Sequence, residues 1–547
     1  MKVWACLELR DLGPLGLASR AGERFGERSV LEHTVARVRR TPGLEGISVL
    51  TEPGGSEAAS ELLGAEAAGV RVLEVLEPDT PRRDPLRRSR KWSKDSWRLG
   101  IMQSMEVDAA GHFPSLLAAA RELNCDAVLL VYPEAVLADA GLLAGLIEHG
   151  APEGQPPLPT ASCQAPGGFA GLFAMTGWLD SVSQQDITYG GLCAWRPDQG
   201  SQDPVHRPEN WLAPVAVRRC EFRGSLDSQR SREVLEEVLR RAPGENGLGP
   251  GAEEAAGIVT GDAALYAGRL PRLVEVELTT SGRVPFAQTP FAREMPERNM
   301  TRDLFAKILD DLAAYDDVLL TLGGWGDPLA HPEVFDLLKL AREKGIYGLH
   351  LDTTGVLLDE EKAGQLLECD VDVVSARLAA NTAETYRALT GREDFEAVAA
   401  NLERFLELQK ETGRLWPFLT VEIEKRVEIE GELIDFWDRW SEKAAWPLIR
   451  PFSTYCGQCE DRATVHLTLA ERTGCRRLMK ELVILADGTV PVCRMDFKAA
   501  SPAGNVAGKS VEELWTSGRI AGLRLEQHDR KFDGFELCPD CGDWDNV

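Results

Sequence analysis

Two series of short apolar runs that alternate with helical patterns constrain the fold of this chain more than any other feature. The first series occupies residues 1–240 and includes VLEHTVARVRR, GISVLTE and DAVLLVYP. The second begins at VEVEL (274–278) and continues to about residue 450. Repeated strand-helix units predict parallel sheets covered by helices. We therefore expect an α/β protein, with an α/β sheet domain first and a partial (β/α) barrel second.

The stretch between the two series has a different composition. Residues 241–268 are rich in Gly, Ala, Pro and Glu, as in APGENGLGPGAEEAAG. Such a composition buries little apolar surface, so it predicts a linker. A chain of 547 residues exceeds what one hydrophobic core supports. We expect domains at 1–240, 269–450 and 451–547.

Residues at the expected helix ends support the second series. Thr301 precedes DLFAKILDDLAAY as an N-cap, and Pro332 and Gly345 lie at the start and just past the end of the next helix. Near the C-terminus, Ser510 and Glu513 have the spacing of a capping box that opens a short helix.

The bulk composition excludes several classes of protein. A formal net charge of −26 repels polyphosphate and argues against nucleic-acid binding. No run approaches the roughly 18 uncharged apolar residues that cross a bilayer, so we expect no membrane span. The N-terminus lacks the apolar segment of a signal peptide, and twelve cysteines are too few for a disulfide scaffold. We expect a cytoplasmic protein whose clustered cysteines bind a metal.

One basic segment departs from the acidic balance. Residues 81–98, PRRDPLRRSRKWSKDSWR, contain eight basic and two acidic side chains. They hold a phosphate or form a solvated loop. We favour the solvated loop, because runs of charge usually lie at the surface.

Four cysteines near the C-terminus have the spacing of a metal site. Cys475 precedes ELVILADGTVPVC, whose Asp-Gly step predicts a hairpin ending at Cys493, and Cys538 and Cys541 form a CxxC turn. Four thiolates satisfy one Zn²⁺ or close a [4Fe-4S] cluster, and the spacing alone leaves both open. Buried core cysteines are the weaker interpretation, because this arrangement rarely arises by accident.

The same C-terminal segment resembles a known module. The run CRRLMKELVILADGTVPVCRMDF, followed by GN (504–505), SVEELW and LCPDCGDW, is similar to the SPASM domain of radical-SAM enzymes. Its Cys-x17-Cys-x44-Cys-x2-Cys layout resembles the shorter twitch version, which implies one [4Fe-4S] cluster instead of zinc. Cys456 and Cys459 form a second CxxC. We interpret this pair as non-ligating or regulatory, because two cysteines alone do not close a site.

The middle domain resembles the radical-SAM family. The stretch TLGGWGDPLAHPEVF, followed by DTTG (352–355), is similar to the part of that family in which a glycine loop holds the methionine end of S-adenosylmethionine. Gly323, Gly324, Gly326 and Asp327 occupy this loop. We weight a structural turn above cofactor binding, because a glycine-rich loop alone is weak evidence.

A radical-SAM enzyme also needs three cysteines after its first strand, so that one iron of its cluster stays open. The matching segment, VEVELTTSGRVPFAQTPFARE, has none, and no cysteine occurs between Cys220 and Cys369. Hydroxyls such as those of Thr279 and Ser281 are poor substitutes, since iron-sulfur clusters select thiolates. The resemblance implies a degenerate core that does not cleave S-adenosylmethionine, and one cluster per chain.

The first domain resembles sugar nucleotidyltransferases, on the basis of GERFGERSVLEHTVARVRR and the strand DAVLLVYPEAV. Glu134 lies near that family's metal-binding Asp, and Asp227 matches its closing Asp. Arg20, Arg24 and Arg28 are candidate phosphate partners. The resemblance implies Mg²⁺ as a further cofactor. We interpret the domain as degenerate, because a lone carboxylate is more often a surface group than a ligand.

The three-part order is similar to the spiro-SPASM proteins. We expect an iron-sulfur-cluster-binding protein that acts by binding or electron transfer in a modification pathway. The alternative is a nucleotidyltransferase-like enzyme acting on a nucleotide-activated substrate. A cluster closed by four cysteines has no open iron to act as a Lewis acid. The sequence assigns no catalytic residue and leaves the partner open, as a small molecule or a protein.

Overall fold

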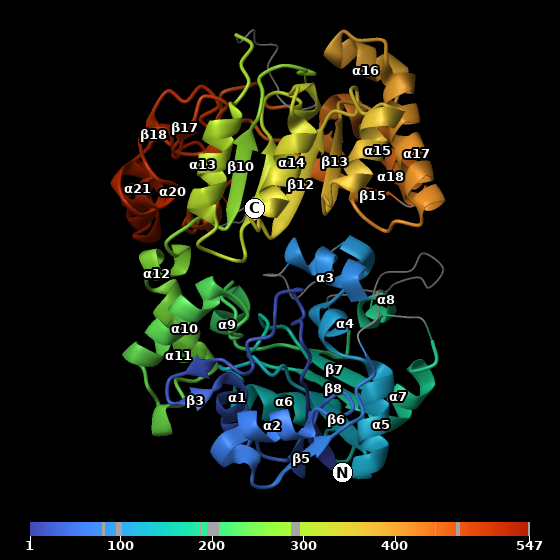
Figure 1. Cartoon of the computed structure of the whole chain (residues 1–547). Coiled ribbons are helices and arrows are strands. Elements are labelled where there is room, and N and C mark those ends of the chain that lie inside the picture. Colours follow the sequence, from blue (N-terminus) through green and yellow to red (C-terminus); the bar gives the residue numbers. More distant parts are fainter. Residues whose placement is uncertain are drawn as a thin grey trace. The chain divides into compact units, whose positions relative to one another are not determined.

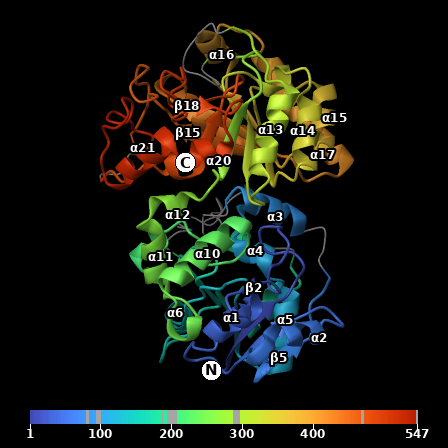
Figure 2. The same cartoon turned by 60° about the vertical axis from the view of Figure 1, so that its left-hand side comes forward.

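The computed structural model describes residues 1–78, 83–93, 101–185, 188–193, 207–285, 296–443, 445–466 and 471–544. The chain divides into two compact units, Met1–Tyr266 and Ala267–Val547 (Figures 1 and 2). Within the described residues, each unit is built on one seven-stranded sheet with helices packed against it. The expected α/β fold class is therefore confirmed.

The sheet of the first unit has the strand order β5-β4-β1-β6-β8-β7-β9. β5, β4, β1 and β6 are parallel, whereas β8 is antiparallel to both β6 and β7. The carboxyl ends of β1 and β6 therefore meet at the same edge, where a parallel sheet presents its loops. The strands are β1 Val3–Glu8, β4 Gly46–Leu50, β5 Val70–Leu73, β6 Ala127–Leu130, β7 Thr160–Cys163, β8 Leu172–Met175 and β9 Asn210–Trp211, with a short β2–β3 ribbon, Arg24–Phe25 and Arg28–Ser29.

The helices of the first unit enclose two apolar clusters. They are α1 Val30–Val38, α2 Ser56–Leu63, α3 Arg83–Lys91, α4 Glu106–Ala110, α5 Phe113–Leu123, α6 Ala140–Gly150, α7 Thr176–Val182, α8 Tyr189–Cys193, α9 Val215–Arg219, α10 Gln229–Arg241, α11 Ala252–Thr260 and α12 Ala263–Ala267.

Residues 241–268 differ from the expected linker. They contain α11 and α12, and Ala252, Ala255, Ala256 and Val259 are buried in the same apolar cluster as α10. Each alanine side chain buries little surface area, but alanines let two helices pack closely. The composition of the segment does not predict this packing. The division between the units falls just after Tyr266, at the end of the stretch.

The basic segment also differs from expectation. Residues 83–91 form α3, in which Arg83, Arg87 and Arg90 are buried. Arg83 donates to the carbonyl oxygen of Gly111 at 2.7 Å, and Arg90 to that of Ser104 at 3.2 Å. The solvated-loop interpretation is wrong for these residues, because their guanidinium groups have partners inside the unit. Residues 79–82 and 94–100 lie outside the described part.

The sheet of the second unit has the strand order β15-β14-β13-β12-β11-β10-β16, with every neighbouring pair parallel. β16 comes from the C-terminal segment and pairs with β10, the first strand of the unit. The segments 269–450 and 451–547, expected as separate domains, thus share one sheet. The strands are β10 Leu273–Glu277, β11 Leu319–Gly323, β12 Gly348–Thr353, β13 Val373–Leu378, β14 Phe418–Lys425, β15 Trp446–Pro451 and β16 Glu481–Ile484.

The helices of the second unit begin largely where the sequence predicts. Thr301 accepts from the backbone N–H of Leu304, and Ser510 accepts from that of Glu513. Gly345, with φ 79°, follows the end of α14. The helices are α13 Arg302–Leu312, α14 Val334–Glu343, α15 Glu360–Glu368, α16 Ala383–Thr390, α17 Phe395–Thr412, α18 Leu433–Glu442, α19 Arg476–Lys480, α20 Val511–Thr516 and α21 Gly518–His528.

The predicted hairpin at 481–493 is only partly present. Its turn forms, with Gly488 at φ 81° and its N–H bonded to the carbonyl oxygen of Leu485 at 2.8 Å. The two flanking strands belong to different sheets: β16 pairs with β10, whereas β17 Thr489–Pro491 pairs with β18 Pro502–Asn505. Leu482 and Ile484 bury more apolar surface in the large sheet than a two-stranded hairpin offers.

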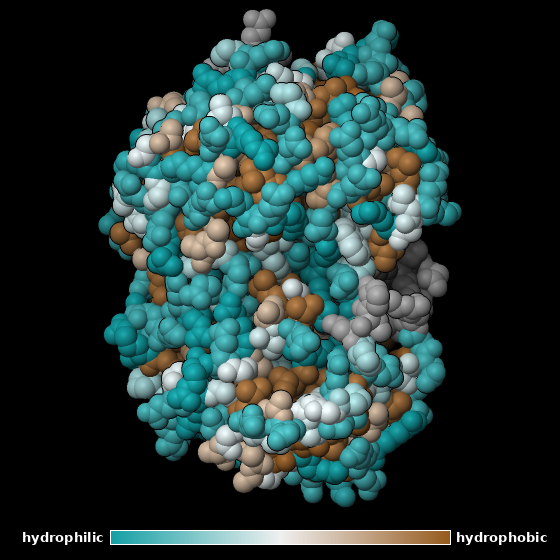
Figure 3. All heavy atoms as spheres, in the orientation of Figure 1, coloured by the Kyte–Doolittle hydropathy of each residue, from teal (hydrophilic) through white to brown (hydrophobic). Residues whose placement is uncertain are grey.

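The surface drawn in Figure 3 is mostly hydrophilic, with small scattered apolar patches. Among the described helices, none combines the length and the apolarity that crossing a bilayer requires.

Candidate functional sites

The four predicted ligand cysteines lie in one small apolar cluster of the second unit. Cys475 is the N-cap of α19, Cys493 follows β17, and Cys538 and Cys541 share a turn in which the N–H of Cys541 bonds to the carbonyl oxygen of Cys538 at 3.2 Å. Cys475 is buried and the other three are half-buried. The apolar residues around them are Leu478, Val492, Leu523, Phe535 and Trp544.

Burial and mutual repulsion work against ionising these thiols. Burial, together with repulsion from the nearby Cys475 and Cys541, raises the pKa of Cys538 to about 12. Burial likewise raises the pKa of Cys493 far above its usual range, with Cys475 adding repulsion. A bound cation or cluster removes this penalty, since a coordinating thiol is deprotonated outright. Four soft sulfur donors in one apolar cluster suit iron-sulfur or zinc chemistry.

The four cysteines lie near one another, but their thiols are not arranged to coordinate a metal ion. In the described part of the chain, no group of three or more His, Cys, Asp or Glu side chains is arranged to hold a metal ion. A centre built from these four cysteines therefore requires the side chains to converge as the metal binds, as metal sites that couple binding to folding do.

The second CxxC lies near this cluster. Cys456 is buried, and its interaction with Cys541 is the main cause of the lowered pKa of Cys541. Cys459 instead points its thiol at the carbonyl oxygen of Ser453, 3.6 Å away. The second CxxC is visible in the sequence, but its spacing does not reveal that its two members diverge.

Internal contacts occupy the predicted cofactor-binding Asp327. This carboxylate is fully buried. It accepts from the hydroxyl groups of Thr353 and Thr354, both at 2.8 Å, from the N–H of Thr354 at 2.9 Å and from that of Leu329 at 3.0 Å. Because both carboxylate oxygens of Asp327 accept hydrogen bonds from neighbouring protein groups, this side chain stabilises the loop. This favours the structural interpretation of the turn.

The three glycines of the same loop are needed for close packing. A methyl group on Gly326 would lie 2.0 Å from the carbonyl oxygen of Thr279, and one on Gly323 would lie 3.1 Å from the Cβ of Asp352. Gly324 has φ 102°, which L side chains rarely adopt. Gly324 also lines a hollow of the second unit, together with Trp325 and Tyr455.

That hollow is open to solvent and lies between the large sheet and the C-terminal segment. Arg494, the neighbour of Cys493, enters it and pairs with Glu275 at 2.8 Å. The ring of Trp325 lies 5.9 Å from that of Tyr455 and 5.5 Å from that of Phe497. The remaining lining residues are Gly324, Arg377, Val483, Leu485, Pro491 and Asp496.

One face of the large sheet is polar, although strands of a parallel sheet are usually apolar on both faces. Alternate residues such as Val274, Val276, Leu320, Leu322, Leu349 and Leu351 belong to the apolar core. The residues between them include Glu275, Glu277, Thr321, His350, Asp352, Ser375, Arg377, Thr420 and Glu422. Charged residues on this face pair with one another, as Asp352 does with Arg377 and Glu422 with Arg450.

Buried charges on this face have shifted pKa values. Burial raises the pKa of Asp352 to about 7 even though it pairs with Arg377, and among the described residues its Oδ1 has no hydrogen-bond partner. Burial also raises the pKa of Glu277 to about 7. His350 has its pKa lowered to about 4 by burial, and it bonds to Ser375 at 2.7 Å.

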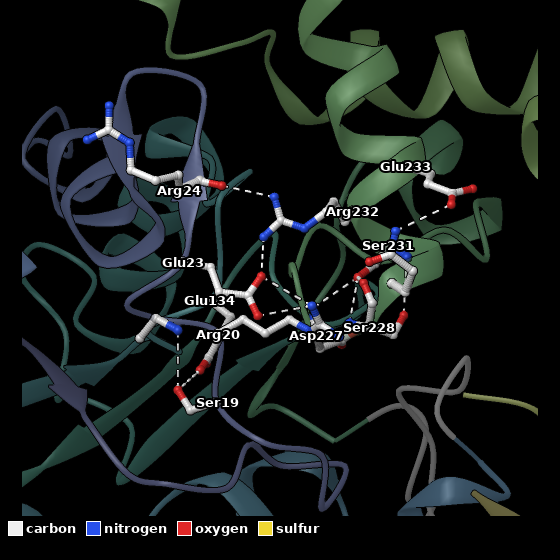
Figure 4. Close-up of polar contacts among 12 residues, drawn as sticks. Ser19, Arg20, Glu23, Arg24, Glu134, Asp227, Ser228, Ser231, Arg232 and Glu233 are labelled. Carbon is white, nitrogen blue, oxygen red and sulfur yellow. Dashed lines mark hydrogen bonds and ion pairs between the residues drawn. The ribbon is translucent and has the colours of Figure 1, made fainter. Parts of the chain in front are cut away.

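In the first unit, the structure brings the two predicted carboxylates together (Figure 4). Glu134 follows β6, and its carbonyl oxygen accepts from the N–H of Leu226 at 2.8 Å, which places Asp227 beside it. Both border a hollow formed with the loop of Gly13 and Pro14. Burial raises the pKa of Glu134, and Asp227 adds repulsion.

Protein groups already partner both carboxylates. The hydroxyl of Ser19 donates to Glu134 (Figure 4), and Arg223 pairs with Asp227 at 2.7 Å and also with Glu106. This arrangement holds the two carboxylates at the carboxyl edge of the sheet, where open α/β sheets bind ligands.

The three predicted phosphate partners are engaged by other protein groups. Arg20 pairs with Glu23 at 3.1 Å, and Arg28 donates to the carbonyl oxygen of Asn246 at 3.1 Å. Arg24 contributes its backbone oxygen to Arg232 at 2.9 Å (Figure 4). None of the three arginines borders the hollow beside Glu134.

Family comparisons agree with the architecture of the second unit. Residues 285–431 match the radical SAM superfamily, and residues 475–542 match SPASM, an iron-sulfur cluster-binding domain. These families imply iron-sulfur clusters, typically several, and S-adenosylmethionine binding.

Three curated relatives match parts of the chain. An uncharacterized protein of Treponema pallidum is 25% identical over 41% of this chain and 64% of its own length. The tungsten-containing aldehyde ferredoxin oxidoreductase cofactor-modifying protein of Pyrococcus furiosus is 29% identical over 24% and 36%. The GTP 3',8-cyclase of Chlorobaculum tepidum is 34% identical over 16% and 27%. The chain thus spans between 27% and 64% of the length of these relatives.

The solved structures that resemble this chain do so with low TM-scores and low sequence identity. BtrN in complex with AdoMet and 2-DOIA has TM-score 0.35 and 14% identity, covering 50% of this chain and 93% of that one. Streptococcus suis SuiB bound to precursor peptide SuiA has TM-score 0.39 and 13% identity, covering 53% and 77%. A cytidylyltransferase from Leptospira borgpetersenii has TM-score 0.32 and 12% identity, covering 48% and 93%. The second unit therefore contains two segments that match known families: residues 285–431 match the radical SAM superfamily, and residues 475–542 match the iron-sulfur cluster-binding SPASM domain.

Proposed function

We propose that this protein holds one [4Fe-4S] cluster on Cys475, Cys493, Cys538 and Cys541 and acts by binding or electron transfer in a modification pathway. The observation that carries the proposal is that these four cysteines, far apart in the sequence, lie in or against one apolar cluster. A bound cluster supplies one-electron chemistry at this position. The cofactor-modifying relative supports a role in a modification pathway.

We further propose that the radical SAM domain is degenerate. Its matched region, 285–431, contains a single cysteine, Cys369. This residue is buried in the apolar core just after α15, and its thiol points at the carbonyl oxygen of Phe335, 3.9 Å away. One core cysteine does not replace the three thiolates that a cluster with an open iron needs.

The hollow beside Arg494 is the proposed binding site. Arg494 and Glu275 give it opposite charges, and the rings of Trp325, Tyr455 and Phe497 give it an apolar wall. A ligand pocket of this kind combines an apolar body with a few placed polar groups. Arg494, which lines the hollow, directly follows the proposed ligand Cys493 in the chain. A small molecule bound in the hollow would therefore lie near the proposed cluster.

Iron analysis tests the cluster. Protein purified without oxygen is expected to contain about four iron and four sulfide per chain and to give one cluster signal by EPR after reduction. Cys475→Ala should lose most of the iron, whereas Cys369→Ala, a matched cysteine in the core, should keep it. Zinc in place of iron, or two clusters per chain, would contradict the proposal.

The degenerate core has its own test. Reduced protein incubated with S-adenosylmethionine is expected to release no 5'-deoxyadenosine. The iron content of the protein should be the same before and after this incubation. Release of 5'-deoxyadenosine above a boiled control would show that reductive cleavage survives and would overturn this part of the proposal.

A second function is favoured by the meeting of Glu134 and Asp227 at one hollow of the first unit. Two carboxylates at the carboxyl edge of a sheet suit Mg²⁺ and a nucleotide-activated substrate. Calorimetric titration with CTP and Mg²⁺ should then give binding that Glu134→Gln abolishes and Glu122→Gln, an exposed carboxylate of the same unit, retains. No heat of binding to the unaltered protein would discard this function.

A further inference from the structure

We propose that the side-chain amide of Gln527 donates a hydrogen bond to a sulfur atom of the centre that Cys475, Cys493, Cys538 and Cys541 bind. This inference rests on the proposed four-cysteine centre. It makes Gln527 a positioning and tuning residue, because Gln527 acts on the metal through sulfur and does not bind it.

The fold buries the polar side chain of Gln527 without giving it a partner. Gln527 lies in α21 and is 0% exposed. Within the described residues, neither its Oε1 nor its Nε2 has a hydrogen-bond partner. Burying an unpaired amide costs free energy, and the large majority of buried polar groups in native proteins are hydrogen-bonded. An amide that the protein leaves unpaired in its interior therefore points to a bound group that supplies the missing partner.

Two observations place Gln527 beside the cysteines. A methyl group on Gly474, the residue before Cys475, would lie 3.2 Å from the backbone oxygen of Gln527. Leu523 belongs to the apolar cluster in or against which the four cysteines lie. Gln527 follows Leu523 by one helical turn, so the two residues share a face of α21. The unpaired amide thus belongs to the side of α21 that packs on the cysteine cluster.

A buried arginine fixes α21 against the segment that follows Cys475. Arg524 donates from Nε to the carbonyl oxygen of Leu478 at 2.9 Å and from Nη1 to that of Trp515 at 3.2 Å. Its Cζ also lies 4.1 Å from the centroid of the Trp515 ring. Leu478 is part of α19, which begins directly after Cys475. These contacts hold α21 in place, so they also hold the backbone of Gln527 in place.

The surroundings favour a sulfur acceptor over a water molecule. A buried water needs about two to four polar partners, whereas the cluster that Leu523 joins consists of apolar side chains and cysteines. The sulfurs of a bound cluster carry negative charge and accept hydrogen bonds, and an amide N–H is a suitable donor. Such bonds stabilise the reduced, more negative state of a cluster and so raise its reduction potential.

An EPR-monitored redox titration of the full-length holoprotein tests the inference. Gln527→Met fills a similar volume without an N–H donor. It should keep the wild-type iron and sulfide content but shift the midpoint potential to a more negative value. Gln409→Met is the matched control, because Gln409 is a buried glutamine of the same unit whose Nε2 donates to the carbonyl oxygen of Pro417 at 2.6 Å. It should leave the potential unchanged.

Urea unfolding of the iron-free protein gives a second readout, which separates tuning from structure. The protein itself gives the amide of Gln527 no partner, so Gln527→Met should leave the urea midpoint unchanged or raise it. Gln409→Met removes a bonded amide and should lower the midpoint. A purely structural role for Gln527 would lower it in both variants.

The outcomes separate this inference from the proposed function. Full iron content with an unchanged potential in Gln527→Met would overturn the inference. Loss of iron in this variant, or a lower urea midpoint of its iron-free form, would also overturn it. Failure of the four-cysteine centre itself would appear earlier, as wild-type protein without iron or as Cys475→Ala with full iron content.

Discussion

At the scale of single residues, Asp327 in the glycine loop (323–327) has a structural role, although the loop resembles a cofactor-binding motif. Asp327 is buried and accepts hydrogen bonds from four donor groups, in the turn at Thr353 and Thr354 and at Leu329. The residue that resembles a cofactor contact therefore joins the ends of two neighbouring strands.

Replacing Asp327 should expose this role. Asp327→Ala leaves several buried donors without an acceptor, so the free energy of unfolding of the second unit should fall by about 3 kcal/mol or more. Urea unfolding measures the change. Asp336→Ala, at an exposed position of α14, should alter it by less than about 0.5 kcal/mol. Equal effects of the two substitutions would contradict a structural role for Asp327.

Glu277 makes stability depend on pH. Its folded pKa of about 7 exceeds the ordinary value of 4.5, because burial disfavours the charged form. The folded state therefore binds more protons between these values, and the free energy of unfolding should fall as pH rises from about 4.5 to 7, by at most about 3 kcal/mol. Unfolding of Glu277→Gln should lose this part of the pH dependence. An unchanged profile in this variant would show that another group, such as Asp352, is responsible.

At the scale of elements, α11 shows what composition conceals. A stretch rich in Gly, Ala and Pro predicts a linker, yet its alanines pack against α10 as a helix. Ala255→Leu adds volume to a fully buried position, and such overpacking costs about 1–3 kcal/mol. Thermal unfolding should show a lower midpoint for the first unit. Glu254→Leu introduces the same side chain at an exposed neighbour and should have little effect; if both variants unfold alike, α11 does not pack as described.

The C-terminal strand β16 is a second element whose partner the sequence does not predict. Its apolar pattern predicts one strand of a hairpin, but the open edge of β10 offers a longer parallel pairing and a larger core. Local pattern identifies a strand, whereas the available partners decide the sheet it joins.

At the scale of the whole molecule, the chain divides into two units and not three. Trp515 and Val490 from the C-terminal segment lie in the same core as the large sheet, so that segment completes the second unit. Fragments 1–266 and 267–547 should each unfold cooperatively when expressed separately. Fragment 267–450 lacks β16 and should aggregate or remain unfolded, as circular dichroism and size-exclusion chromatography would show. Cooperative unfolding of 267–450 would instead support an autonomous middle domain.

The sequence alone determined the fold class, most helix ends and the SPASM segment, because hydrophobic period, capping residues and cysteine spacing are local signals. Thr301 and Ser510 cap as expected, and the family match covers the expected cysteines. Only the tertiary structure decided that β16 joins the large sheet, that α3 buries its arginines and that Glu134 and Asp227 border one hollow. These contacts join distant segments. Their energies depend on burial and on the neighbours the fold supplies, which no local pattern encodes.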